Sequence, residues 1–176
     1  MLRSTVIAAA LLVSSVALAA NEPTPTPTSF GAYSVTVAPD PDSTLSAAEY
    51  QITVRNEQLL LSRLSAPYSG TLSKSFVADL DHDGAFEVVV TYTEAATHAT
   101  VIKVYSWKDD LLQPIKLAEL DEQQKQGYRG DDEVAVTDGK LLRLFQVYEL
   151  QNGEWSATPS TRKLHYSFDS SRWMTD

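Results

Sequence analysis

Large apolar residues recur at every second position along most of this chain, and this alternation constrains its fold more than any other feature. In the clearest run, the even positions carry four large side chains: Phe86, Val88, Val90 and Tyr92. Because successive side chains of a strand point to opposite faces, such a run predicts a strand with one apolar face. Further candidate strands, some less regular, lie at 33–37, 50–54, 59–64, 75–80, 100–107, 115–120, 133–136, 140–148 and 163–168. Because the less regular of these ten runs need not all form strands, we expect about eight or nine short strands.

Turn-forming dipeptides separate several of these runs. Three of them accept the positive φ angles of tight hairpins: Asp83-Gly84, Asp138-Gly139 and Asn152-Gly153. Consecutive strands are therefore predicted to be antiparallel neighbours. No stretch has a clean helical period, although 117–126 has room for a short helix. The sequence predicts an all-β fold with one domain at 30–176, either an antiparallel β-sandwich or a flattened barrel.

The N-terminal residues have the pattern of a secretory signal peptide. Arg3 gives a positive start, 4–20 carries no charge, and the small residues up to Ala19 favour cleavage after that position. Without cleavage, the same stretch would be a short membrane anchor. Alternating Pro and Thr at 20–29 favour an extended, solvated spacer. We predict a signal peptide at 1–19 and a mature protein that is periplasmic or secreted, with no membrane contact after cleavage.

The charge balance argues against nucleic acids as partners. The formal net charge is −9, from 14 Lys and Arg against 23 Asp and Glu, so phosphate backbones and anionic lipid heads are not attracted. Cysteine is absent, which excludes disulfides, thiolate metal sites and cysteine nucleophiles. Stability must therefore come from packing.

No catalytic motif stands out. The chain has no G-x-S-x-G nucleophile turn and no glycine-rich phosphate cradle, and its three histidines lack a local metal-pair spacing. A hydrolase that uses a pair of catalytic carboxylates stays open as an alternative, because the separation of Asp and Glu in space cannot be read from the sequence. By elimination, a binding or inhibitory protein without catalytic residues is favoured over an enzyme.

The sharpest local pattern is the acidic turn at 79–84, with carboxylates at its first, third and fifth positions and a glycine at its sixth. Such spacing suits Ca²⁺, which takes ~6–8 oxygen ligands. The turn lacks the glutamate at the twelfth position of an EF-hand, while Glu87 at the ninth could add an oxygen. Asp79, Asp81 and Asp83 are thus candidate Ca²⁺ ligands. The alternative is an ordinary turn in which these side chains cap backbone groups.

A second informative segment, 127–133, places an aromatic residue and a cation between two glycines. These residues are Tyr128 and Arg129, and acidic residues follow at 131–133. We expect Arg129 to pair with its acidic neighbours and so to shape a rigid loop, which is followed by a hairpin.

Several of these segments follow one another in a recognisable order: 31–35, 76–84, 87–90, 127–136 and 141–148. Together they resemble the bacterial periplasmic inhibitors of invertebrate-type (I-type) lysozyme, and the resemblance covers most of the chain from Gly31 to Phe168. It implies a β-sandwich that inserts exposed loops into the substrate cleft of a host lysozyme. An acidic inhibitor suits a basic enzyme, because complementary fields speed encounter.

In that family one contact loop, rich in Ser and Gly with a Tyr, follows the strand after the acidic turn. The corresponding stretch here, 94–100, is shorter and has no Gly or Tyr. Thr97 and His98 are placed at its tip as candidate contacts with lysozyme. Further candidate contacts are Thr100, Tyr128 and Arg129.

The rival hypothesis is a Ca²⁺-stabilised periplasmic β-sandwich binding module that has no contact with lysozyme. Two further questions stay open at this point. Tyr128 and Arg129 are either surface contacts or loop scaffolding, and the chain is either a monomer or a homodimer.

Overall fold

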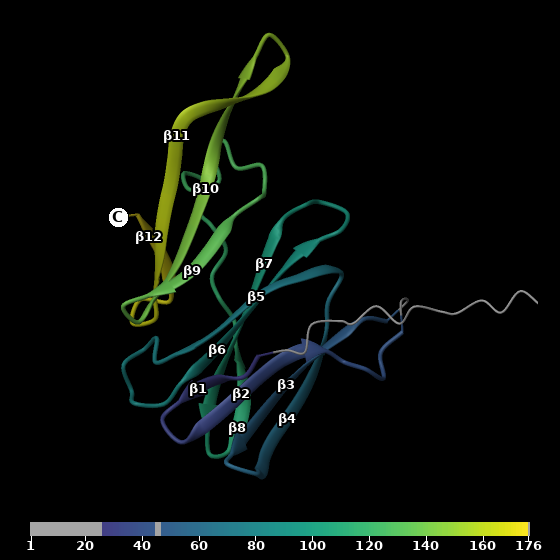
Figure 1. Ribbon diagram of the computed structural model, residues 1–176. Coiled ribbons are helices and arrows are strands. Elements are labelled where there is room, and N and C mark those ends of the chain that lie inside the picture. Colours follow the sequence, from purple (N-terminus) through teal and green to yellow (C-terminus); the bar gives the residue numbers. More distant parts are fainter. Residues whose placement is uncertain (1–25, 45–46, 176) are drawn as a thin grey trace, which may run out of the picture.

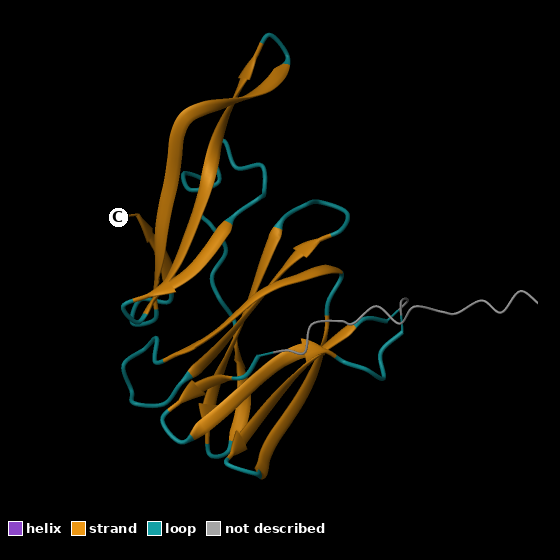
Figure 2. Cartoon of the chain, in the orientation of Figure 1, coloured by secondary structure: helices purple, strands orange, loops and turns teal. Residues whose placement is uncertain are grey.

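The computed structural model describes residues 26–44 and 47–175, and strands make up most of that part of the chain (Figure 2). The described residues contain no helix, so the expected all-β fold is confirmed. The strands are β1 (Thr28–Phe30), β2 (Tyr33–Pro39), β3 (Glu49–Asn56), β4 (Leu59–Pro67), β5 (Gly70–Ala78), β6 (Glu87–Glu94), β7 (Thr100–Lys108), β8 (Leu111–Ile115), β9 (Glu133–Thr137), β10 (Lys140–Gln151), β11 (Glu154–Ser167) and β12 (Arg172–Thr175). The predicted signal peptide, 1–19, lies outside the described residues.

These strands form three four-stranded sheets in which hydrogen-bonded neighbours are antiparallel. The strand order is β1-β2-β3-β4 in the first sheet, β5-β6-β7-β8 in the middle sheet and β12-β11-β10-β9 in the third sheet. Each described sheet is open at both edges, so the fold is a sandwich-like stack rather than a flattened barrel. Figure 1 shows the middle sheet between the other two. Nowhere in 26–44 and 47–175 is there a helix with the length and apolarity that crossing a membrane requires.

Two apolar cores hold this stack together, one on each face of the middle sheet. The first core, between the first and middle sheets, includes Val35, Tyr50, Ile52, Val54, Val88, Val90, Tyr105 and Trp107. The second core, between the middle and third sheets, includes Leu80, Val89, Val104, Leu141, Phe145, Leu164, Tyr166 and Trp173. Burying apolar area on both faces of one sheet is how a chain without disulfides gains stability.

Strand β6 supplies both cores because its side chains alternate between the two faces. Val88 and Val90 belong to the first core, and Val89 belongs to the second. The pleat places Glu87 on the same face as Val89, and its side chain is fully buried. The sequence predicts one apolar face for this strand. The structure covers the other face as well, because the third sheet packs against it.

The predicted strand count is too low. The structure has twelve strands in its described part, and two of the additional ones, β1 and β12, have only three and four residues. Runs this short carry no readable period. Strand β1 also includes Thr28 and Ser29, which were assigned to the spacer at 20–29, and it pairs with β2 at the edge of the first sheet.

The predicted strand at 115–120 is wrong. Strand β8 occupies Leu111–Ile115 instead, and Pro114 lies within it. A proline is tolerated there because β8 is an edge strand. The chain then leaves the middle sheet, and Leu120 reaches the second core without joining a strand. In the segment 117–126, residues 122–126 form turns, the first five residues are irregular, and no helix forms.

Gly70, the first residue of β5, gives a direct test of how tightly the start of the middle sheet is packed. Its φ is +122°, and an added Cβ would lie 2.0 Å from the Thr93 carbonyl oxygen. We expect Gly70→Ala to lower the free energy of unfolding by at least about 2 kcal/mol in urea titrations. Gly31→Ala is the control, because its Cβ would meet nothing within 4 Å; we expect it to cost about 1 kcal/mol. Equal losses for both variants would contradict the packing described.

Candidate functional site

The loop between β6 and β7 is held in shape by its own hydrogen bonds. The Thr97 hydroxyl donates to Glu94 Oε2 at 2.5 Å and accepts from the Ala99 N–H at 3.2 Å. The backbone N–H of His98 donates to the Glu94 carbonyl at 3.0 Å. His98 takes the left-handed conformation, with φ +56°, that a glycine often provides in such loops. Thr97 and His98 are therefore exposed at the tip of a defined loop, as predicted from the sequence.

The loop at 127–132 lies directly against this first loop, although about 30 residues separate them in the chain. The Thr100 hydroxyl donates to the Asp132 carbonyl at 3.3 Å, and the Asp131 N–H donates to the His98 carbonyl at 3.4 Å. A Cβ on Gly130 would lie 2.8 Å from the same His98 oxygen, so only glycine fits this approach. The structure thus brings the two predicted contact segments together.

A buried ion pair supports the loop at 127–132, which we call the second loop, from the interior of the protein. Arg143 on β10 donates to the Asp132 carboxylate and, at 3.0 Å, to the Tyr128 hydroxyl. The Asp132 side chain is completely buried; that burial raises its pKa, while the charge of Arg143 opposes the rise. The Tyr128 ring packs edge-on against Phe145, with 4.9 Å between the ring centroids. Tyr128 therefore supports the loop through its ring and its hydroxyl group.

Arg129 does not make the ion pair expected of it. Two of its acidic neighbours pair with other cations: Asp132 pairs with Arg143, and Glu133 Oε1 lies 3.9 Å from Lys74 Nζ. The Arg129 guanidinium instead lies 4.8 Å from the centre of the Trp155 ring. Cation–π contacts of this kind leave the guanidinium free to meet an anion from solvent. Arg129 is exposed and available for such a contact.

Trp155 belongs to an arm that sequence reasoning did not identify as functional. The arm, 148–157, is the outer end of the β10–β11 hairpin and extends beyond the rest of the molecule (Figure 1). Leu150 and Trp155 face each other across the two strands and are 59% and 48% exposed. The sequence could have revealed this arm, because large apolar residues lie on both sides of the Asn152-Gly153 turn, whereas hairpin tips are normally polar.

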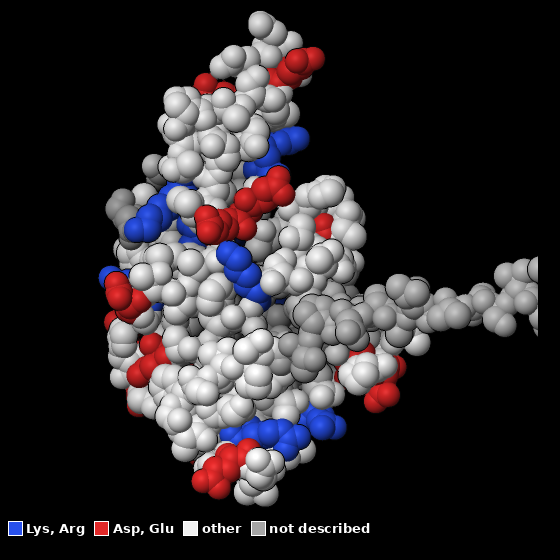
Figure 3. Space-filling model, in the orientation of Figure 1, with Lys and Arg blue, Asp and Glu red and all other residues white. Residues whose placement is uncertain are grey.

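We define the contact surface as Thr97, His98, Arg129, Leu150 and Trp155. At its centre is an open recess of about 330 Å³ lined by Thr97, Ala99, Tyr128, Arg129 and Gly130. The face of the molecule in Figure 3 has acidic and basic side chains interspersed among uncharged ones, without a large patch of one sign. The contact surface is therefore suited to a protein partner through one cation, aromatic area and a rigid loop.

The acidic turn brings together a different set of carboxylates from the predicted one. Oxygens of Asp79, Asp81 and Glu87 lie within 4.8 Å of one another, and this is the one such group of potential metal ligands among the residues that the structure describes. Asp83 is not a member of this group, and its Oδ1 accepts a hydrogen bond from the Ala85 N–H at 2.8 Å. The predicted set of Asp79, Asp81 and Asp83 is thus changed by the exchange of Asp83 for Glu87.

The Glu87 carboxyl is in an unusual environment for a charge. Burial raises its pKa to about 7, the N–H of Leu80 lowers it by donating to Oε2 at 2.8 Å, and the charges of Asp81 and Asp83 raise it again. In the absence of a cation, this carboxyl is therefore protonated below neutral pH and about half protonated at pH 7.

In solutions without divalent cations, the protonation of Glu87 should make the free energy of unfolding depend on pH. Glu87 titrates near 4.5 in the unfolded chain and near 7 in the folded one, so the free energy of unfolding falls as the pH rises through that window. We expect a loss of about 3 kcal/mol, and we expect Glu87→Gln to abolish it because an amide does not titrate. Urea titrations in chelator at about pH 4 and pH 8 measure both proteins. Identical pH dependence in the two would contradict this description of Glu87.

Comparisons with known proteins do not assign the chain to a family. No family model and no curated protein matches it. Its function has to be inferred from its own residues and from the contacts that they make.

Proposed function

We propose that this protein is a periplasmic inhibitor of lysozyme, of the kind directed at the invertebrate-type enzyme, and that it covers the substrate cleft with its contact surface. One observation carries the proposal: the loop that the resemblance implies as a contact, 94–100, and the loop with the candidate contacts Tyr128 and Arg129, 127–132, meet around an open recess. The chain is proposed to act by occlusion and to have no catalytic residues of its own.

The rigidity of the first loop favours this function. Inserting a loop into a cleft costs conformational entropy, and a loop that already has its bound shape loses less. The hydrogen bonds of Thr97 and the close approach of Gly130 to His98 hold the loop before any partner arrives. The missing glycines and tyrosine of the family's loop are compensated in this proposal by the second loop and by Trp155.

The charge of Arg129 suits the chemistry of a lysozyme cleft. Glycoside hydrolases generally carry a pair of Asp or Glu side chains on either side of the bond that they cleave. Arg129 is the cation of the contact surface, and its planar guanidinium can donate two parallel hydrogen bonds to one carboxylate. The net charge of −9 adds long-range attraction to a basic enzyme.

The loop tip is tested by Thr97→Ala combined with His98→Ala. In a cell-wall lysis assay, we expect the purified protein to inhibit invertebrate-type lysozyme, and the double variant to raise the inhibition constant at least about tenfold. Chicken and goose-type lysozymes measure selectivity in the same assay. Because Thr97 also holds the loop, His98→Ala alone separates contact from loop shape. Unchanged inhibition by the double variant would remove this loop from the interface.

The role of Arg129 is tested by a matched pair of charge removals. We expect Arg129→Gln to weaken inhibition by about tenfold or more, because a charge-assisted pair in a desolvated cleft is lost. Arg63→Gln is the control, since Arg63 is also exposed but lies on β4 of the first sheet. Both changes alter the net charge equally, so an equal loss in the two variants would indicate long-range attraction only and would contradict a direct contact.

The Ca²⁺-stabilised binding module without lysozyme contact is the second candidate. The group formed by Asp79, Asp81 and Glu87 favours it. This candidate predicts no inhibition of any of the three lysozymes, together with a melting temperature that rises with Ca²⁺. The lysis assay therefore separates the two functions.

A further inference from the structure

Two carboxylate oxygens in the acidic turn are buried and have no hydrogen-bond partner. They are Asp79 Oδ1 and Glu87 Oε1. The other oxygen of each is occupied, since Asp79 Oδ2 accepts from Gly84 and Glu87 Oε2 accepts from Leu80. A carboxylate oxygen that is removed from water and left unpaired is costly, so buried charges are normally paired or coordinate a metal.

The main groups that act on the Glu87 carboxyl do not include a cation. The ion pairs of Lys74, Lys125 and Arg143 go to other carboxylates. The charged groups that act on Glu87 are Asp81 and Asp83, which have the same sign as Glu87 itself. Ser106 lies opposite Glu87 in the register of β6 and β7, and its side chain lowers the pKa of Glu87 through a hydrogen bond, but Oε1 is left without a partner.

We propose that the acidic turn binds one Ca²⁺ ion through the carboxylates of Asp79, Asp81 and Glu87. Their oxygens lie within 4.8 Å of one another. Three oxygens with this spacing all lie within about 2.8 Å of a common centre, which is close to the 2.3–2.6 Å of Ca²⁺–oxygen bonds, so small side-chain shifts bring all three to one ion. Ca²⁺ also accepts irregular geometry and completes its shell with water, whereas Mg²⁺ demands a smaller, near-octahedral arrangement.

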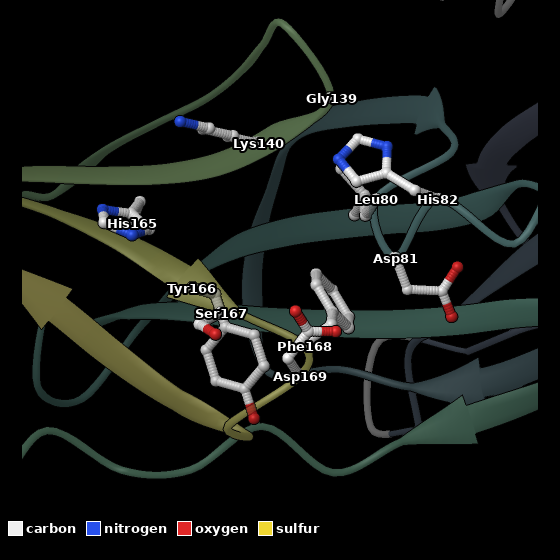
Figure 4. Close-up of a pocket in the computed structure, with 10 residues that line it drawn as sticks. All are labelled: Leu80, Asp81, His82, Gly139, Lys140, His165, Tyr166, Ser167, Phe168 and Asp169. Carbon is white, nitrogen blue, oxygen red and sulfur yellow. The ribbon is translucent and has the colours of Figure 1, made fainter.

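The position of the turn gives the bound ion a structural role. The turn joins β5 to β6 in the middle sheet and packs against the β9–β10 turn of the third sheet. A Cβ on Gly139 would lie 3.0 Å from His82 Cε1 and 3.2 Å from the Asp79 carbonyl oxygen. A pocket lies beside this contact and is lined by residues of the acidic turn, the β9–β10 turn and β11. Figure 4 shows His82 of this pocket beside Gly139, and the Asp81 carboxylate directed away from Tyr166 and Ser167 of β11. Ca²⁺ binding thus stabilises the junction between the middle and third sheets.

The experiment is a thermal unfolding series near neutral pH on the purified protein, first stripped of cations with chelator. CaCl₂ is added in steps, and MgCl₂ at the same concentrations is the ionic control. At about 100 times the dissociation constant, we expect Ca²⁺ to raise the melting temperature by about 5–10 °C. Isothermal titration calorimetry measures the stoichiometry, for which we expect one ion per chain.

Three variants locate the site. We expect Asp81→Asn and Glu87→Gln each to remove the Ca²⁺-dependent rise. Asp83→Asn is the matched control, because it removes the same charge from the same turn while its amide oxygen can still cap Ala85. We expect it to keep the rise. If Glu87→Gln does not fold, Asp81→Asn alone tests the site. This variant is expected to fold, because the Asp81 side chain accepts only one backbone hydrogen bond, from the Asp83 N–H.

Three outcomes would overturn the proposal. One is a melting temperature of the unaltered protein that does not respond to Ca²⁺, in which case Glu87 is simply protonated. Another is a rise that persists in both Asp81→Asn and Glu87→Gln, which would place the ion elsewhere. The third is an equal rise with Mg²⁺, which would contradict the selectivity for Ca²⁺.

Discussion

The complete burial of strand β6 is the constraint on which the rest of the structure depends. Its residues from Glu87 to Tyr92 are all buried, because one face packs on the first sheet and the other on the third. Each fully buried valine contributes on the order of 1.5–3 kcal/mol. The strand also connects the two candidate sites, since Glu87 at its start belongs to the acidic turn and Glu94 at its end holds the contact loop. A change in the position of β6 would therefore alter both sites.

The all-β class and the antiparallel pairing could be predicted because they depend on local features. Alternation marks a strand, and an Asp-Gly or Asn-Gly dipeptide marks a hairpin, each within a few residues. The second covered face of β6 could not be predicted in this way, because the side chains that cover it come from 117–173, far along the chain. The same distance explains the change in the acidic group. The local pattern offers Glu87 as an additional oxygen ligand, but it does not reveal that the Glu87 side chain is buried.

The contact surface was predictable in part, for a related reason. Thr97 and His98 could be placed at a loop tip from strand spacing alone. Charge proximity in the sequence suggested ion pairs for Arg129, but its neighbour Asp132 turns inward to Arg143, where burial strengthens the interaction. Arg129 is left to the ring of Trp155, which comes from another hairpin. Neighbours in the chain compete with neighbours in space, and the more deeply buried partner prevails here.

The distribution of the tryptophans gives the protein a built-in optical reporter. Trp107 and Trp173 are 6% and 4% exposed, one in each core, whereas Trp155 is 48% exposed on the arm. Indoles in apolar surroundings emit at shorter wavelengths than indoles in water. The intrinsic fluorescence therefore has two components. Trp107 and Trp173 in the interior emit at shorter wavelengths, the blue component, and Trp155 on the arm emits at longer wavelengths, the red component. Any molecule that covers the arm will change the red component while the blue one stays constant, so occupancy can be followed without a label.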